Sequence, residues 1–218
     1  MLPRMPRSPS LPYVLPFAVL IGLLAAMPGL ALSPRLELAV WVLALGAALL
    51  VFSRRAIDLS VGNIAGSLAV GLGVFALWIA PELVFPGYRE ALFGEQTASF
   101  PAEARGDPLA LALRAARAVV LVPIVEELFW RAWLPRWLIR HDFHAVPLGT
   151  YTPFAFAVTA LLFAVEHGQY WDVGLLAGIA YNAWMWRTRR LGDCILAHAV
   201  TNACLAGYVV IAGQWQYW

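Results

Sequence analysis

The stretch Val125-Glu126-Glu127-Leu128-Phe129-Trp130-Arg131 places two adjacent carboxylates and an arginine inside an apolar run at positions 109–138. An ionisable group at the centre of a membrane helix costs roughly 2.5–3.5 kcal/mol on insertion scales, so such groups are seldom incidental. On a helix, Glu127 and Arg131 stand at i and i+4 and can pair. Glu126 lies about 100° further round the helix without a partner there, which favours a carboxylate acting as a base. A buried structural network joining helices explains the same residues, and this stretch alone does not separate the two interpretations.

The composition of the whole chain is that of a membrane protein. Of 218 residues, 61% are hydrophobic and 13% are charged, and the mean hydropathy is +0.72. Soluble domains carry about 25% charged residues. We therefore expect an all-α fold, a polytopic integral membrane helical bundle forming a single membrane domain over residues 1–218. The lipid bilayer is the expected surrounding, and the net charge of +2 gives no indication of nucleic acid as a partner.

Seven apolar runs predict about seven transmembrane helices. The fifth and sixth runs are shorter than the about 20 residues that a full crossing needs, so the count lies between six and eight. The first three form an N-terminal group, the catalytic core is expected over 109–212, and 81–108 is expected to be an extramembrane loop. Gly62 and Gly66 have the GxxxG spacing that allows close helix contact, and Gly73 follows in the same run. The runs cover residues 11–32, 36–52, 61–80, 109–138, 154–165, 173–186 and 194–212.

The arginines predict how the chain is oriented. Cytoplasmic loops carry an excess of basic residues, and alternate loops of the seven-helix arrangement divide the arginines unequally. We therefore expect a cytoplasmic N-terminus, with residues 1–10 as a short disordered start. One side receives Arg4, Arg7, Arg54, Arg55, Arg136, Arg140, Arg187, Arg189 and Arg190; the other receives Arg35, Arg89 and Arg105.

Two of the four histidines fall in or beside apolar runs. His167 ends the stretch Phe163-Ala164-Val165-Glu166-His167, and His198 opens His198-Ala199-Val200-Thr201-Asn202. His198 and Asn202 stand at i and i+4, on one face of a helix. A single histidine in a membrane helix is more often a hydrogen-bonding bridge than a catalyst. Together with the Glu-Glu pair, however, these residues can build one polar cavity among apolar helices.

The three stretches resemble the motifs of one family, the CAAX-protease and bacteriocin-processing (CPBP) intramembrane peptidases, typified by the Ras-converting endopeptidase. That family has Glu-Glu-x-x-x-Arg, Phe-x-x-x-His and His-x-x-x-Asn motifs, in this order, on separate membrane helices. The chain size is similar to the CAAX protease-related branch of bacteria, which implies the bacterial inner membrane. The matching residues here are Glu126-Glu127 with Arg131, Phe163 with His167, and His198 with Asn202.

The resemblance implies hydrolysis of a peptide bond in a membrane-associated protein or peptide. Glu126 and His167 would activate water, His198 and Asn202 would stabilise the oxyanion, and Glu127 with Arg131 would shape the site. The chemistry agrees with these residue types, because attack on an amide needs a base and donors aimed at the oxyanion.

The same residues are compatible with a zinc-dependent mechanism and with a metal-free mechanism. Glu126, His167 and His198 could supply a zinc site with water as fourth ligand, although the chain lacks the HExxH pattern. A metal-free glutamate mechanism uses the same residues. We favour the metal-free description and keep zinc as an alternative.

Two further function classes use the same polar residues. A non-catalytic immunity or chaperone-like protein would bind a peptide without cutting it, but has no need of Glu126 beside an oxyanion-type pair. An ion or proton carrier would string polar residues along a path through the bilayer, and the first three runs show no such series.

One feature of the seven-helix model conflicts with a shared site. Straight full-length helices at about 1.5 Å per residue would hold His167 and His198 more than about 10 Å apart in depth. We therefore expect the short fifth and sixth helices to be tilted or partly inserted, with His167 at mid-depth.

Overall fold

The structure, a computed structural model, describes residues 8–95 and 98–218, and this part of the chain is helical without any strand. Arg4, Arg7 and most of the expected disordered start lie outside the described residues. The α-helices are α1 (Leu11–Ala26), α2 (Pro34–Ala48), α3 (Ile64–Val84), α4 (Tyr88–Phe93), α5 (Pro108–Ala116), α6 (Val122–Glu127), α7 (Leu134–Ile139), α8 (Pro153–Glu166), α9 (Trp171–Thr188) and α10 (Leu191–Ala212). The short 3₁₀ turns are η1 (Met27–Gly29), η3 (Ala102–Ala104), η6 (Phe143–Ala145), η7 (Gly168–Tyr170) and η8 (Trp215–Tyr217), and the π-helical turns are η2 (Leu49–Ser53), η4 (Arg117–Leu121) and η5 (Leu128–Trp133).

Several helices are long and apolar enough to cross a membrane. Five such segments occur among the described residues, and α8 is a shorter apolar helix of 14 residues. The structure is therefore that expected of a polytopic membrane bundle. The number of seven crossings and the orientation of the chain in the membrane stay predictions. The five segments are Leu11–Gly29, Pro34–Ser53, Ile64–Val84, Pro108–Ile139 and Leu191–Ala212.

Local sequence signals fix where the helices begin. Asp107 accepts hydrogen bonds from the backbone N–H groups of Leu109 and Ala110, and it caps α5. Thr152 caps α8 in the same way through the N–H of Ala155. Both helices have proline in the first turn, where its missing N–H breaks no helical hydrogen bond.

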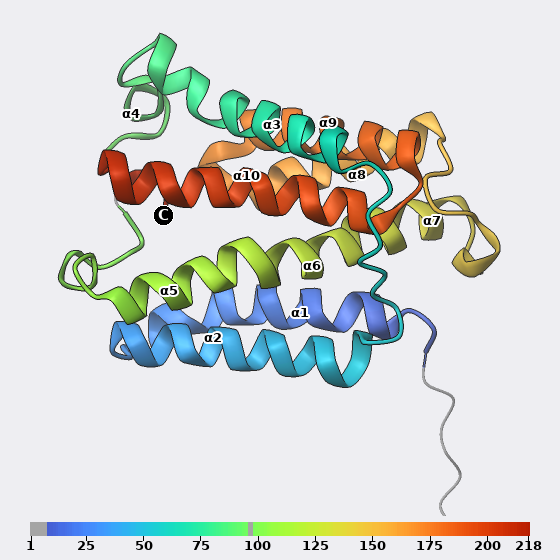
Figure 1. Cartoon of the computed structure of the whole chain (residues 1–218), viewed down its shortest axis with the longest axis horizontal. Helices are drawn as coiled ribbons and strands as arrows, with labels where there is room; N and C mark the ends of the chain where they lie inside the picture. Colours follow the sequence, from blue (N-terminus) through green and yellow to red (C-terminus); the bar gives the residue numbers. More distant parts are fainter. Residues whose placement is uncertain (1–7, 96–97) are drawn as a thin grey trace, which may run out of the picture.

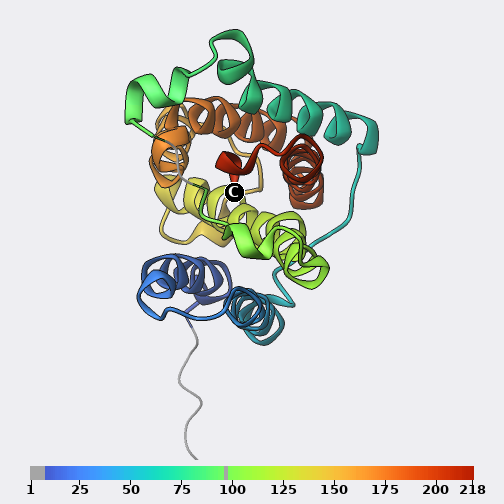
Figure 2. The same cartoon turned by 90° about the vertical axis from the view of Figure 1, so that its left-hand side faces the viewer.

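The segment Pro108–Ile139 separates two groups of helices (Figures 1 and 2). On one side α1 and α2 pack against it, and on the other α10 packs along α3 while α8 packs along α9. The loops after α2, α7 and α9 lie at one end of the bundle, at the right of Figure 1, and α4 and the C-terminus lie at the other. In this arrangement, residues from the end of α8, from α6 and from α10 line one cavity.

Small residues let α3 approach its neighbours closely. A Cβ added to Gly71 would lie 2.5 Å from the carbonyl oxygen of Ala197, so α3 and α10 touch there through backbone. A Cβ on Gly66 would collide with the side chain of Trp184, as the GxxxG spacing predicts for a close contact. At Gly73, by contrast, no described atom lies within 4 Å of such a Cβ.

The segment 81–108, predicted as an extramembrane loop, contains helical structure. Its first residues belong to α3, which continues to Val84, and α4 and η3 follow. Glu82 stabilises this arrangement by accepting hydrogen bonds from the backbone N–H groups of Gly87 and Arg89. The part of the expected loop at positions 96–97 lies outside the described residues.

Candidate active site

A cavity of about 90 Å³ lies between α3, α6, α10 and the segment from α8 to α9. All four predicted catalytic residues line it, although they come from three distant parts of the sequence. Its lining residues are Trp78, Val122, Glu126, Phe163, His167, Ala177, Tyr181, His198, Thr201, Asn202 and Leu205.

Glu126 is the carboxylate of this cavity. Its side chain projects from α6, and the residue is 6% exposed. Its Oε2 is buried and has no hydrogen-bond partner among the described residues. A buried oxygen without a partner is uncommon because it loses water without compensation, so Glu126 is available to a molecule in the cavity.

Glu127 faces a different set of neighbours. Its Oε2 lies 3.3 Å from Nε of Arg131, and its Oε1 lies 3.0 Å from Nδ1 of His198. The side chains of Glu127 and Arg131 are fully buried. The expected contact between them is therefore present, and Glu127 also links α6 to the histidine of α10.

The guanidinium of Arg131 lies against aromatic rings. Its Cζ is 4.7 Å from the centre of the Phe163 ring and 5.6 Å from that of Tyr181. Such contacts offset part of the loss of hydration of a buried cation. Its three nitrogens find no hydrogen-bond partner within the part of the chain that the structure describes.

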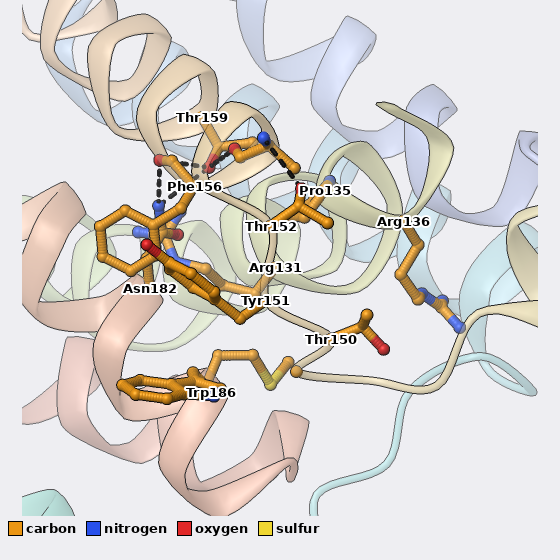
Figure 3. Close-up of a pocket in the computed structure, with 13 residues that line it drawn as sticks. Arg131, Pro135, Arg136, Thr150, Tyr151, Thr152, Phe156, Thr159, Asn182 and Trp186 are labelled. Carbon is orange, nitrogen blue, oxygen red and sulfur yellow. Dashed lines mark hydrogen bonds between the residues drawn. The ribbon is translucent and has the colours of Figure 1, made fainter. Parts of the chain in front are cut away.

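Arg131 also lines a second cavity, of about 30 Å³ (Figure 3). There Asn182 donates hydrogen bonds to the carbonyl oxygen of Phe156 and to Oγ1 of Thr159, as the dashed lines show. The space is large enough for an ordered water, whose oxygen can accept from at most two of the Arg131 nitrogens.

His167 follows α8 and closes one side of the first cavity. Its Nδ1 lies 2.7 Å from the carbonyl oxygen of Phe163. Because a carbonyl can only accept, Nδ1 carries a proton, and Nε2 of the neutral ring is then an acceptor. Trp78 of α3 packs edge-on against the ring at 5.2 Å.

The turn after His167 is held from outside the bundle. Arg89 of α4 is 2% exposed and donates from Nη1 to the carbonyl oxygen of Gln169 and to Oδ1 of Asp172, both at 2.6 Å. Its Cζ lies 4.6 Å from the centre of the Tyr170 ring, which stacks on Trp78. These contacts fix the segment that carries His167.

His198 lies on α10 between a carboxylate and an aromatic ring. The contact of its Nδ1 with Glu127 leaves Nε2 as the second ring nitrogen, and the ring stacks on Tyr181 at 5.1 Å. Tyr181 in turn donates to Oγ1 of Thr201, which donates to the carbonyl oxygen of Gly71. The histidine is thus positioned by α3, α6 and α9 together.

Asn202 stands one turn after His198 and contacts the π-helical turn η4. Its Nδ2 donates to the carbonyl oxygen of Ala118 at 2.7 Å. A π-helical turn disturbs the regular i to i−4 hydrogen bonds and frees carbonyl groups for such contacts. The second hydrogen of the same amide nitrogen remains for another acceptor.

The residues proposed for zinc do not form a ligand set. Among residues 8–95 and 98–218, no three His, Cys, Asp or Glu side chains come close enough together to hold a metal ion. Glu126, His167 and His198 line one cavity without meeting the spacing that a tetrahedral site requires.

Six of the residues that line the cavity were not singled out from the sequence, and three of them have aromatic or hydroxyl side chains: Trp78, Tyr181 and Thr201. Each is an ordinary residue of an apolar helix, so composition and spacing carry no signal for it. Tyr181 is 1% exposed, and its contact with His198 depends on how α9 packs against α10.

His167 and His198 line the same cavity, as a shared site requires. Helix α8, which His167 follows, has only 14 residues. The position of His167 relative to a membrane stays a prediction.

Comparison with known families gives a match over residues 108–204. The matching family model is described as type II CAAX prenyl endopeptidase Rce1-like. The matched segment begins at the start of α5 and includes the Glu-Glu, Phe-His and His-Asn motifs, so the resemblance drawn from those motifs is confirmed. Comparison with curated proteins and with solved structures gave no match.

Proposed function

Because residues 108–204 form an Rce1-like domain of the type II CAAX prenyl endopeptidase family, we propose that this protein is an intramembrane endopeptidase. Its substrate is a membrane-associated protein or peptide. The observation that carries the proposal is the cavity in which Glu126, His167, His198 and Asn202 meet.

Glu126 is the general base in this proposal. Its unpartnered Oε2 can accept a proton from a water molecule in the cavity, which makes that water a nucleophile. Nε2 of His167 is a second acceptor for the same water, because Nδ1 is engaged with Phe163. When the water donates its two hydrogens to these two acceptors, its lone pair points toward the substrate carbonyl.

His198 and Asn202 stabilise the developing oxyanion. Asn202 offers the amide hydrogen that Ala118 does not use. His198 donates from Nε2 only when its ring carries a second proton, and the Glu127 carboxylate at 3.0 Å balances that positive charge. An acidic residue that orients a histidine and stabilises its charged form has the same role in serine protease triads.

Glu127 and Arg131 act through His198 and are positioning residues. Arg131 stabilises the charge of Glu127 in a buried environment, and Glu127 holds the ring of His198. The mechanism uses a water nucleophile without a step through a metal ion, because the side chains present do not form a ligand set.

The decisive experiment measures cleavage by the full-length protein in lipid nanodiscs. The probes are quenched fluorescent peptides that end in a C-a-a-X sequence, with and without a prenyl group on its cysteine. Glu126→Gln keeps the shape of the side chain and removes the base, so we expect activity to be abolished while the melting temperature is retained. Glu90→Gln, at an exposed position of α4, is the matched control and should cleave like the unsubstituted protein. Equal activity of Glu126→Gln at equal expression would refute the catalytic role.

A second variant tests the oxyanion role of Asn202. Asn202→Ala should reduce kcat by about 10²–10³ and leave KM nearly unchanged, since the interaction is made in the transition state. A change confined to KM would assign Asn202 to substrate binding instead.

A further inference from the structure

A separate cavity of about 220 Å³ lies at the end of the bundle where α9 passes into α10 and where α3 begins. In Figure 1 this is the right-hand end, away from the C-terminus. The catalytic residues do not line it. Its lining residues are Gly62, Asn63, Arg187, Thr188, Arg190 and Asp193.

Asp193 supplies an acceptor to this cavity. The residue is 1% exposed, and its Oδ1 accepts hydrogen bonds from the backbone N–H groups of Gly62 at 2.9 Å and Asn63 at 3.0 Å. Its Oδ2 is buried without a hydrogen-bond partner in residues 8–95 and 98–218. A buried carboxylate oxygen of this kind calls for a donor, and a cationic one satisfies it best.

The rim of the same cavity carries positively charged side chains, opposite in charge to Asp193. Arg187 and Arg190 line it and are exposed, so an anion can reach their side chains from solvent. A guanidinium presents paired N–H groups that match the oxygens of a phosphate. The cavity therefore offers an acceptor for a cation next to two donors for an anion.

The position of the cavity indicates the source of such a ligand. Two of the apolar segments that can cross a membrane, α3 and α10, begin at Ile64 and Leu191, directly beside the lining residues. The cavity thus lies at the boundary of the apolar part of the bundle, at the level where lipid headgroups stand.

We propose that this cavity binds the headgroup of a phosphatidylethanolamine molecule. The primary ammonium donates to Oδ2 of Asp193, and the phosphate accepts from Arg187 and Arg190. A choline headgroup has no N–H to donate, and phosphatidylglycerol has no cation, so neither satisfies both parts of the site. The inference is independent of the peptidase activity.

The experiment measures the melting temperature of the full chain in detergent as a function of added lipid. We expect phosphatidylethanolamine to raise it in a saturable manner, with smaller effects of phosphatidylcholine and phosphatidylglycerol at equal acyl composition. Soluble glycerophosphoethanolamine, which lacks the acyl chains, tests the source of the ligand and should act only at much higher concentration.

Asp193→Asn is the informative variant, because its amide oxygen can still accept from Gly62 and Asn63 while its nitrogen cannot accept from an ammonium. We expect it to weaken the apparent affinity for phosphatidylethanolamine about tenfold or more. Asp142→Asn, at an exposed carboxylate outside the cavity, is the matched control and should respond like the unsubstituted protein. Arg187→Gln tests the phosphate side and should also weaken the response.

Three results would overturn the proposal. Equal stabilisation by the ethanolamine and choline lipids would remove the role of Asp193. An unchanged response of both Asp193→Asn and Arg187→Gln would show that the lipid acts elsewhere. Stronger stabilisation by phosphatidylglycerol than by phosphatidylethanolamine would indicate an anion site that does not use the carboxylate.

Discussion

Among the arginine–carboxylate pairs of the described residues, two differ most in geometry and in environment. Arg35 and Asp107 form two hydrogen bonds, of 2.5 and 3.1 Å, and the Arg35 side chain is 63% exposed. Arg131 and Glu127 approach to only 3.3 Å, yet both side chains are fully buried. The pair with the better geometry is thus the one that stands in solvent.

The surroundings of an ion pair decide how much it contributes to stability. Water and salt screen an exposed pair, which contributes little to stability. Removal of one member of a buried pair leaves the other charge without compensation, which destabilises strongly. We therefore expect the buried pair to matter far more, despite its longer contact.

The largest effect on stability is expected for Arg131→Ala. This change leaves Glu127 buried beside His198 without its cation, and should lower the free energy of unfolding by roughly 3–5 kcal/mol. Denaturant unfolding in detergent measures the difference, with Arg35→Ala as the reference. Equal losses for the two variants would mean that burial does not set the strength of these pairs.

An intermediate effect is expected for Arg89, whose side chain is 3% exposed while that of Asp172 is 21% exposed. Arg89→Ala removes two short charge-assisted hydrogen bonds and should lower the free energy of unfolding by about 1.5–3 kcal/mol. Arg89→Lys keeps the charge and should recover part of the loss. A loss as large as that of Arg131→Ala, measured by the same unfolding experiment, would contradict the ranking by exposure.

The smallest effect is expected for the exposed pair, and it should depend on pH. The hydrogen bond from Arg35 lowers the pKa of Asp107 below its usual value. A carboxyl group with a lowered pKa in the folded state contributes stability that is present above its unfolded pKa, about 3.9. That contribution is lost as the pH falls through the folded pKa.

Asp107→Asn isolates this contribution, because asparagine can still cap α5. The melting temperature of the variant should fall slightly below that of the unsubstituted protein at neutral pH. The difference should shrink below about pH 4 and in high salt. A difference that grows on acidification would show that Asp107 acts other than as a charged partner of Arg35.

Most of the helices were predictable because apolar runs mark them directly. The run predicted at 109–138 is the segment Pro108–Ile139, and the run predicted at 154–165 is α8, Pro153–Glu166. Glu126, His167, His198 and Asn202 were found because a polar residue stands out in an apolar helix. All four residues line one cavity, as expected if they lie close together. Their catalytic roles stay proposals.

The remaining features depend on packing rather than on composition. Tyr181 reaches His198 only because α9 lies along α10. The sequence of an apolar helix that contains a tyrosine does not predict such a contact. The approach of α3 to α10 at Gly71 was not singled out, although glycine spacing pointed to Gly66. Helix α4 is six residues long, too short for periodicity to reveal.

The two π-helical turns on either side of α6 make the chain length of this region as important as its residues. A π-helical turn accommodates a residue that an α-helical turn would not. Deletion of one residue between Glu127 and Arg131 would change the spacing of this pair from i, i+4 to i, i+3 and alter the winding on which the buried contact depends. Both residues would still be present. A sequence alignment that scores only matching residues across such a gap would therefore overlook a change in the geometry of the site.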